Sequence, residues 1–287
     1  MVARVIGMLV QEGVDRFVVV VHPDDRPLIE LLSRPLWAGR VRLVYQAQRL
    51  GMAHALECAA PLIREDGAPA FVLASCDNVY PSGHVAAMIA QGRDGSGLDA
   101  VLALMRVRPE MIPTLAVVAM EDGRVTRIVE KPRPEEAPSD LGVPALYVLS
   151  VRLLDYLPHV PVSPRGEREL QDALRMWIED GAAVGGRLVP WRMTLTRPAD
   201  LLALTCHVLH HDPTSAVVVP PLPSGVHVTP PVRIDAGVDL GSGCSIGPDV
   251  YLEAGSGVGA GATVCRAVVL RGATVDAGAV VEGTVLG

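Results

Sequence analysis

Unbroken runs of apolar residues alternate with helix-like segments along the first two-thirds of the chain. Phe17–Val21 and Ala70–Ser75 are such runs, and they predict strands that are buried on both faces of a sheet. Helices are predicted at Pro27–Leu32, Gly51–Ile63 and Ser82–Gln91. Strands that alternate with helices form βαβ units. The pattern therefore predicts an α/β fold with a Rossmann-like, mostly parallel sheet and helices on both faces.

This alternation continues to residue 211. Further strands are predicted at Val41–Tyr45, Asp99–Val107 and Val143–Leu149, together with a hairpin of Leu115–Met120 and Arg124–Val129. Two more helices are predicted at Glu167–Asp180 and Pro198–His210. We therefore assign residues 1–211 to one domain, and the proline-rich residues 212–227 to a semi-rigid linker.

From residue 228 the apolar positions recur every six residues. One series consists of Val228, Ile234, Leu240, Ile246, Leu252, Val258, Val264 and Leu270, and a second of Val232, Val238, Cys244, Val250, Ala262 and Val268. A hexapeptide period is typical of a parallel β-helix, in which each hexad supplies one short strand and one turn. The pattern resembles the left-handed β-helix of hexapeptide-repeat proteins, so we assign residues 228–287 to such a domain. The repeat is expected to decay after Leu270, because the next position is Asp276.

The composition excludes several classes of protein. The formal net charge is −7 and there is no basic patch, so we expect no nucleic-acid partner. No apolar run reaches the roughly 18 residues of a membrane span, and no signal-peptide pattern opens the chain, so we expect a cytoplasmic protein without membrane association. The five cysteines have no metal-ligand spacing, and we expect them to be reduced, buried small hydrophobes.

Lysine and asparagine each occur once, at Lys131 and Asn78. Because the chain otherwise uses arginine as its cation, Lys131 indicates a site that needs a compact ammonium group. A GC-rich genome or a hot habitat also depletes these residue types, and chance survival of one lysine is the competing explanation.

Asp77 follows the predicted strand that ends at Ser75. In open α/β sheets, ligands bind outside the carboxyl ends of the strands, where a carboxylate can hold Mg²⁺ that bridges nucleotide phosphates. The alternative is a turn aspartate that caps the following helix. The position alone leaves both roles open.

Two segments resemble motifs of one enzyme family. Phe71-Val-Leu-Ala-Ser-Cys-Asp77-Asn78 is similar to a strand ending in Gly-Asp-Asn, and Gln46-Ala-Gln-Arg-Leu-Gly51 is similar to a nucleotide-base motif. Both motifs occur in sugar-phosphate nucleotidyltransferases, and glucose-1-phosphate thymidylyltransferases in particular. The resemblance implies that Asp77 binds Mg²⁺, that the amide of Gln46 reads a pyrimidine edge, and that Gly51 lets backbone approach the base.

Two later segments carry the resemblance into the sugar-phosphate half of such a site. Glu130-Lys131-Pro132 resembles the family's Glu-Lys-Pro, which implies that Glu130 binds sugar hydroxyls and that Lys131 offsets charge on the sugar phosphate. Arg165-Gly-Glu167 followed by Glu169-Leu-Gln-Asp172 resembles the family segment Arg-Gly-Glu-x-Glu-Ile-Thr-Asp, which implies that Arg165 contacts phosphate. The implied reaction is attack of a sugar-1-phosphate on the α-phosphorus of dTTP or UTP with release of pyrophosphate. Mg²⁺ is its implied cofactor, and Asp77 and Lys131 are the implied catalytic residues.

The chain departs from the family pattern at several positions. The family's first strand and its glycine-rich loop, Gly-x-Gly-Thr-Arg, have no counterpart, because Met1-Val-Ala-Arg-Val matches the helix after that loop. We expect that strand to lie centrally in the sheet. Met193 stands where a second metal-binding aspartate is expected, although Mg²⁺ prefers hard oxygen ligands. Cys76 and Ala145 stand where the family has glycines.

Two alternatives to an active nucleotidyltransferase therefore stay open. The first is a non-catalytic regulatory paralogue that binds a nucleotide sugar. The second is a hexapeptide-repeat acyltransferase, although no histidine follows His227. We expect the β-helix to be an oligomerisation module, in a homo-oligomer or in a hetero-oligomer with an active paralogue. A cluster of His207, His210 and His211 could suggest metal, but at a helix end histidines commonly complement the terminal carbonyls.

Overall fold

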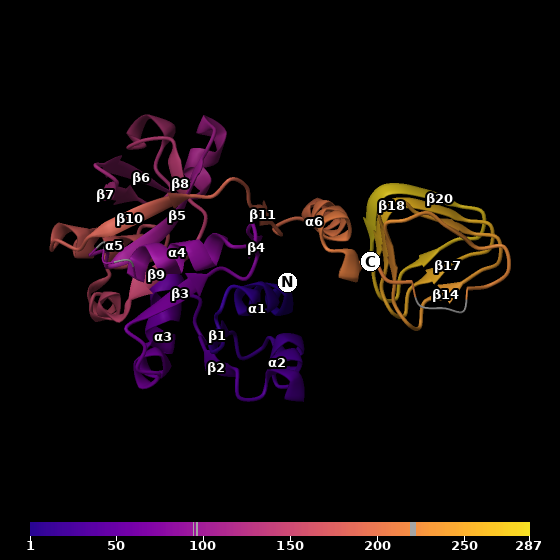
Figure 1. The fold of residues 1–287 in the computed structure, drawn as a ribbon, viewed down its shortest axis with the longest axis horizontal. Coiled ribbons are helices and arrows are strands. Elements are labelled where there is room, and N and C mark those ends of the chain that lie inside the picture. Colours follow the sequence, from indigo (N-terminus) through magenta and orange to yellow (C-terminus); the bar gives the residue numbers. More distant parts are fainter. Residues whose placement is uncertain (94, 96, 219–221) are drawn as a thin grey trace. The chain divides into compact units, whose positions relative to one another are not determined.

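The computed structural model describes residues 1–93, 95, 97–218 and 222–287. They divide into two compact units, Met1–Arg192 and Met193–Gly287 (Figure 1). Within these ranges no helix is long and apolar enough to cross a membrane.

The boundary between the two units lies after Arg192, whereas the sequence pattern had placed the end of the first domain at residue 211. The helix Pro198–His211 (α6) packs on strands of the C-terminal repeat and belongs to the second unit.

A seven-stranded sheet forms the centre of the first unit. In spatial order its strands are β10 (Val184–Leu188), β7 (Arg124–Val129), β6 (Ala116–Glu121), β8 (Leu141–Val143), β5 (Ala100–Arg106), β9 (Leu146–Ser150) and β3 (Ala70–Ala74). Neighbouring strands in this order pair antiparallel, whereas β10 also pairs parallel with β5. The sequence pattern predicted a mostly parallel sheet, whereas these pairs make it mixed. The β6–β7 turn returns the chain directly beside itself, and the other antiparallel neighbours are not consecutive in the sequence.

Helices cover both faces of this sheet. The α-helices of the unit are α1 (Val2–Gln11), α2 (Arg26–Leu32), α3 (Met52–Glu65), α4 (His84–Arg93) and α5 (Leu170–Glu179). In β5, Leu102 and Leu104 pack with residues of α3 and α5. The alternate residues Val101 and Ala103 point to the other face and pack with residues of α1 and α4. The predicted α/β fold class is confirmed.

Shorter elements connect these strands and helices. They are β4 (Asn78–Val79) and the 3-10 helices η1 (Pro35–Trp37), η2 (Pro109–Thr114), η3 (Pro134–Glu136), η4 (Val151–Asp155) and η5 (Leu157–His159).

The sequence pattern did not predict β10, since this strand contains Gly185 and Gly186. A Cβ atom on Gly186 would lie 2.3 Å from Leu104, and one on Gly185 would lie 2.7 Å from Leu98. The glycines therefore allow the strand to lie close against the core, and their lack of side chains removes the apolar pattern that would reveal it.

The first two strands form a sheet of their own. β1 (Phe17–Val21) pairs parallel with β2 (Val41–Tyr45), and neither pairs with the seven-stranded sheet, in which β3 is the last strand. Val19 of β1 and Val72 of β3 nevertheless pack in the same core, and both are only half-buried. Two apolar strands thus share a core while each keeps an unpaired edge.

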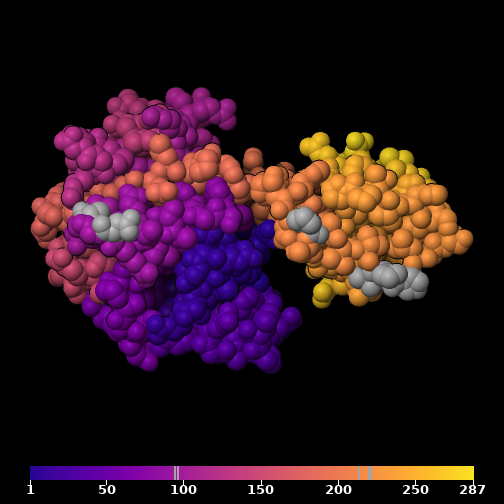
Figure 2. All heavy atoms as spheres, viewed as in Figure 1, coloured from indigo at the N-terminus to yellow at the C-terminus, as the bar shows by residue number. Residues whose placement is uncertain are grey.

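The second unit contains a parallel β-helix with three faces. Its elements before the coils are β11 (Met193–Thr194), α6 and η6 (Pro213–Ser215). The coil strands are β12 (His227–Val228), β13 (Val232–Ile234), β14 (Asp239–Leu240), β15 (Ser245–Ile246), β16 (Val250–Leu252), β17 (Gly257–Val258), β18 (Thr263–Val269), β19 (Thr274–Val275) and β20 (Val280–Leu286). Each of the first coil's strands pairs parallel with residues three hexads further along the chain. Atoms fill the interior that the ribbon of Figure 1 leaves open (Figure 2).

The hexad register shifts by one residue within β18. Val250 pairs with Ala267, and Leu252 pairs with Val269, so this coil is one residue shorter than three hexads. Val269 is 0% exposed and takes the core position that the strict six-residue spacing had assigned to Leu270. The prediction that the repeat decays after Leu270 was therefore wrong. The apolar series continues in the core at Val275, one residue before Asp276, which the six-residue spacing had pointed to.

Part of the predicted linker packs on the β-helix. Val218 forms a parallel bridge with Ile234, and Leu222 and Val226 pack against the β-helix core. Residues 219–221 of the predicted linker lie outside the described residues. The segments on either side of them therefore belong to the folded second unit rather than to a free spacer.

Candidate functional site

Asp77 lies in the turn between β3 and β4. Its Oδ1 atom is buried and has no hydrogen-bond partner in the part of the chain that the structure describes. The neighbouring Asn78 is fixed, since its Nδ2 donates to Ser75 Oγ at 2.5 Å and its Oδ1 accepts from Arg192 at 3.3 Å. A buried carboxylate oxygen without a partner is costly, so this atom is poised for a ligand.

The alternative role for Asp77, a cap on helix α4, is performed by another residue. The carboxylate of Glu12 accepts hydrogen bonds from the backbone N–H of Gly83 and, at 3.0 Å, from that of Ala86. Glu12 is 9% exposed and comes from the end of α1. The donors at the start of α4 are thus satisfied without Asp77.

Ala145 borders the same turn in a left-handed backbone conformation, with φ of 51°. Its carbonyl accepts from Ser75 N at 3.1 Å, and the hydroxyl of Tyr80 donates to the carbonyl of Pro144. Burial raises the pKa of Tyr80, although nearby Arg192 opposes the rise, so the phenol stays protonated and donates. A positive φ explains why the family places glycine here, because a Cβ atom strains this conformation.

Replacing Ala145 with glycine is expected to stabilise the first unit by about 1 kcal/mol, because the strain at positive φ is relieved. The three tryptophans all lie within residues 1–192, so tryptophan fluorescence during urea unfolding reports on this unit alone. Ala103→Gly is the matched control, since Ala103 is 0% exposed in the middle of β5 and its replacement should destabilise the unit. Equal losses in both variants would contradict the assignment of strain to Ala145.

Glu130 and Lys131 directly follow β7. Lys131 has φ of 44°, and its backbone N–H donates to Leu115 O at 3.2 Å. Its Nζ lies 3.6 Å from Glu130 Oε1. A lysine held at positive φ costs about 1–2 kcal/mol, and such strained residues cluster at functional sites. The backbone here places the ammonium group of the only lysine in the sequence beside the largely buried carboxylate of Glu130.

Glu130 is the more buried partner of this pair. Its side chain is 15% exposed, and Oε2 is buried without a hydrogen-bond partner among the described residues. Burial raises the pKa of Glu130, the charge of Lys131 lowers it, Glu169 raises it further and Arg165 lowers it. The carboxylate is therefore held at an energetic cost, as expected for a group that accepts hydrogen bonds from a ligand.

Glu130→Gln is expected to stabilise the first unit at pH 7, and the gain should shrink as the pH is lowered. The folded state holds the Glu130 proton more tightly than the unfolded chain does, so Glu130 makes wild-type stability fall as the pH rises through its raised pKa. Urea unfolding of both proteins between pH 4 and 8, followed by tryptophan fluorescence, measures the difference. A gain that does not change with pH would contradict this origin.

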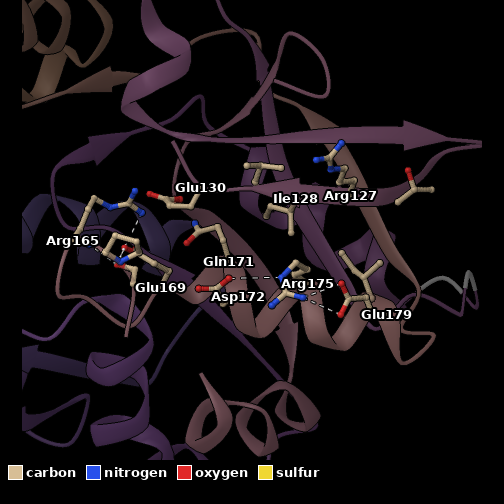
Figure 3. A pocket seen from close by; sticks show the side chains of 14 residues that line it. Arg127, Ile128, Glu130, Arg165, Glu169, Gln171, Asp172, Arg175 and Glu179 are labelled. Carbon is tan, nitrogen blue, oxygen red and sulfur yellow. Dashed lines mark hydrogen bonds and ion pairs between the residues drawn. The ribbon is translucent and has the colours of Figure 1, made fainter. Parts of the chain in front are cut away.

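A cavity of about 530 Å³ opens beside Glu130, between β7 and α5 (Figure 3). Glu130, Arg165 and Glu169 lie at one end, and Arg127, Arg175 and Glu179 lie at the other. The remaining lining residues are Thr126, Ile128, Val129, Ser163, Pro164, Gln171, Asp172 and Ile178. Glu130 and Arg165, which were both predicted to bind the sugar phosphate, therefore share one cavity.

Arg165 stands in the loop that precedes α5. Its guanidinium donates to Glu169 Oε1 at 2.8 Å, and the hydroxyl of Ser163 donates to the same oxygen at 3.1 Å. Glu169 is 5% exposed. The sequence pattern did not single out Glu169, although it lies in the segment that resembles the family motif. The bond to Glu169 holds Arg165 at the cavity, but it also occupies one of the guanidinium nitrogens that could donate to a ligand.

Gln46 and Gly51 meet at the start of α3. Gln46 Nε2 lies 3.1 Å from Gly51 O, to which it donates, and 3.0 Å from His54 Nδ1. A Cβ atom on Gly51 would lie 2.6 Å from the backbone oxygen of Arg168. Glycine is therefore required here, because the backbone of Arg168 occupies the space that a side chain would need. The sequence did not reveal this reason.

The histidines and cysteines of the described residues do not gather into one cluster. His210 Nε2 lies 2.7 Å from Asp249 Oδ1, while the rings of His207 and His211 stack with centroids 4.2 Å apart. No group of three or more potential metal-binding side chains occurs within the described ranges. The five cysteines are unpaired, but Cys244 alone among them is buried as predicted. Cys76 is exposed in the turn before Asp77, and the others are half-buried, namely Cys58, Cys206 and Cys265.

Comparison with known proteins identifies the family of the first unit. The family model described as nucleotidyl transferase matches residues 1–190. The low-salt glycan biosynthesis nucleotidyltransferase Agl11 of Haloferax volcanii is 30% identical over 164 residues, which cover 56% of this chain and 43% of that protein. The UTP–glucose-1-phosphate uridylyltransferase AglF of the same organism is 27% identical over 194 residues, or 67% of this chain and 76% of that protein.

Solved structures show the same fold. A UDP-glucose pyrophosphorylase from Acinetobacter baumannii superposes with a TM-score of 0.61 at 21% identity, covering 74% of this chain and 83% of that one. A UDP-glucose pyrophosphorylase complexed with UDP-glucose gives a TM-score of 0.57 at 20% identity, covering 66% and 78%. With the family model covering most of the first unit, the resemblance seen in the sequence is confirmed, and the chain belongs to the nucleotidyl transferase family of enzymes.

Proposed function

We propose that this protein joins a nucleoside triphosphate to a sugar-1-phosphate. The observation that carries the proposal is a pair of buried carboxylate oxygens that have no hydrogen-bond partner among the described residues, in a family of this chemistry. They are Asp77 Oδ1 after β3 and Glu130 Oε2 after β7. Relatives that are named for UTP and glucose-1-phosphate favour these two substrates for the first tests. Since the chain spans only 43% of the length of the nucleotidyltransferase Agl11, the substrates are proposals.

In the proposed reaction a phosphate oxygen of the sugar-1-phosphate attacks the α-phosphorus of the triphosphate. A new P–O bond forms, the bond between the α-phosphorus and the bridging oxygen breaks, and pyrophosphate leaves with that electron pair. No proton has to be removed from the attacking phosphate, so catalysis depends on position and charge. Lys131 offsets the sugar-phosphate charge, Glu130 accepts hydrogen bonds from sugar hydroxyls, and Arg165 contacts phosphate.

On the nucleotide side, Gln46 offers the base the acceptor oxygen of its amide, since Nε2 donates to Gly51 O and lies 3.0 Å from His54 Nδ1. Asp77 fits a magnesium ligand, because it is a carboxylate whose Oδ1 is buried and has no partner within the described ranges. When bound there, Mg²⁺ would neutralise charge on the phosphates. Asp77 would hold the triphosphate at the carboxyl end of β3 through that ion.

Pyrophosphate release from UTP and glucose-1-phosphate in the presence of Mg²⁺ tests the proposal. Formation of UDP-glucose, with one pyrophosphate released for each molecule formed, is the expected result. dTTP replaces UTP in a second arm. If neither triphosphate is turned over with several sugar-1-phosphates, the enzymatic proposal fails.

A non-catalytic paralogue is the second candidate. Met193 in place of an aspartate, and the strained alanine at position 145 in place of a glycine, favour it. This candidate predicts UDP-glucose binding without turnover. Calorimetry that detects no UDP-glucose binding would remove it.

For the β-helix of residues 228–287 we propose a role in oligomerisation, which the mass of the assembly in sedimentation experiments would test.

A further inference from the structure

The side chain of Arg168 joins three segments of the first unit. It is 15% exposed, and its nitrogens donate in three directions. Nε donates to Val160 O at 3.2 Å, Nη2 donates to Leu157 O, and Nη1 donates to the carboxylate of Glu57 in α3. A planar guanidinium can satisfy three acceptors in one fixed geometry, which a lysine ammonium cannot reproduce.

The backbone of Arg168 joins the same segment to the start of α3. Its N–H donates to Leu50 O at 2.7 Å, and its carbonyl accepts from Ala53 N at 3.0 Å. These bonds enclose Gly51, whose carbonyl in turn accepts from the amide of Gln46. Hydrogen bonds at the start of α3 therefore connect this segment to Arg168 through Leu50 and Ala53, and to the proposed base-binding Gln46 through Gly51.

On its other side, Arg168 closes the loop that carries Arg165. Val162 and Arg168 form an antiparallel bridge, and Ser163 N donates to Glu167 O at 2.7 Å. Arg165 lies within this loop and lines the cavity with Glu130. The position of the loop relative to α3 thus determines how far Arg165, one of the proposed sugar-phosphate residues, lies from Gln46.

We propose that Arg168 is a positioning residue that fixes the distance between the nucleotide-binding and sugar-phosphate-binding halves of the site. The inference rests on the proposed function, because it assigns a role to the spacing between its two half-sites. Arg168 contacts neither substrate in this proposal. It acts through the 163–168 loop and through the start of α3.

A ligand that occupies both halves gains affinity from their fixed spacing, whereas a ligand of one half does not. Arg168→Gln is therefore expected to weaken UDP-glucose binding at least tenfold. Binding of UTP alone and of glucose-1-phosphate alone should stay within about threefold of wild type, because each meets only its own residues. Isothermal calorimetry on the full chain measures all three ligands.

Glu57→Gln provides a second variant, because it removes the ion pair while Arg168 keeps its two carbonyl acceptors. Glu57→Gln should also weaken UDP-glucose binding selectively, but to a smaller extent. It replaces Arg168→Gln as the test variant if Arg168→Gln does not fold. Arg64→Gln is the matched control, since Arg64 pairs with Asp155 at 2.7 Å from the exposed side of α3. Its binding of all three ligands should equal that of wild type.

The outcomes separate this inference from the proposed function. Selective weakening of UDP-glucose supports the positioning role. Unchanged UDP-glucose binding, or equal weakening of all three ligands, overturns it, since equal weakening indicates a general structural role. If the wild-type chain itself binds none of the three ligands, the proposed function fails, and the positioning role fails with it.

Discussion

Replacing Asp77 with asparagine is expected to lower turnover with Mg²⁺, UTP and glucose-1-phosphate by about 100- to 1,000-fold, the effect typical of losing one stabilising group at a developing charge. The substitution keeps the size of the side chain but removes the negative charge that favours a magnesium ligand. Stability should be unchanged or higher, because a buried carboxylate oxygen without a partner is replaced by an uncharged group.

The control for this experiment is Asp122→Asn, in the exposed turn between β6 and β7. Asp122 has φ of 49°, which asparagine also tolerates, so activity and stability should both stay at the wild-type level. Calorimetry of UTP with and without Mg²⁺ gives a second readout that does not depend on turnover. Affinity should increase with Mg²⁺ in wild type but not in Asp77→Asn, and equal magnesium dependence in both would rule out Asp77 as the ligand.

Gly51→Ala is expected to destabilise the first unit by about 4 kcal/mol, the sum of backbone strain and a steric clash. Gly51 has φ of 93° and ψ of −179°, a region that is essentially restricted to glycine. The added Cβ would lie 2.6 Å and 2.9 Å from the backbone O and N of Arg168, and backbone atoms that are hydrogen-bonded on both sides cannot easily move. Urea unfolding followed by tryptophan fluorescence measures the loss.

Gly67, at the other end of α3, provides the matched control. It has φ of 71°, and no atom lies within 4 Å of the position that a Cβ would occupy. Gly67→Ala should therefore cost only about 1 kcal/mol, which is the strain of the positive φ without a clash. Similar losses in the two variants would show that the contact with Arg168 does not limit this position.

Several features of the fold followed from local patterns. The bounds predicted for β1, β2 and β7 agree with the structure, because the apolar residues of such short segments and the turns that bound them are a local property of the chain. The six-residue period likewise revealed the β-helix, since each hexad repeats the same short strand and turn. The single lysine marked a position that proved to have an unusual backbone, at φ of 44°.

Other features depended on contacts between distant segments. Gly185 and Gly186 conceal a strand because they make room for Leu98 and Leu104, and Gly51 makes room for Arg168. The sequence shows that a glycine is present, but not which segment approaches it. For the same reason Glu12, 65 residues from Asp77 in sequence, was not recognised as the residue that bonds the start of α4.

The sequence by itself determined the two-part organisation, the α/β class and the family resemblance, because these are carried by short motifs and by the period of apolar residues. Tertiary structure decided the register of the last coils, where Val269 rather than Leu270 enters the core. It also decided that Asp77 Oδ1 and Glu130 Oε2 are buried without a hydrogen-bond partner in the described parts of the chain, and that Arg165 is bonded to Glu169. Burial and hydrogen bonding are properties of how distant segments pack, so a linear pattern of residue types does not encode them directly.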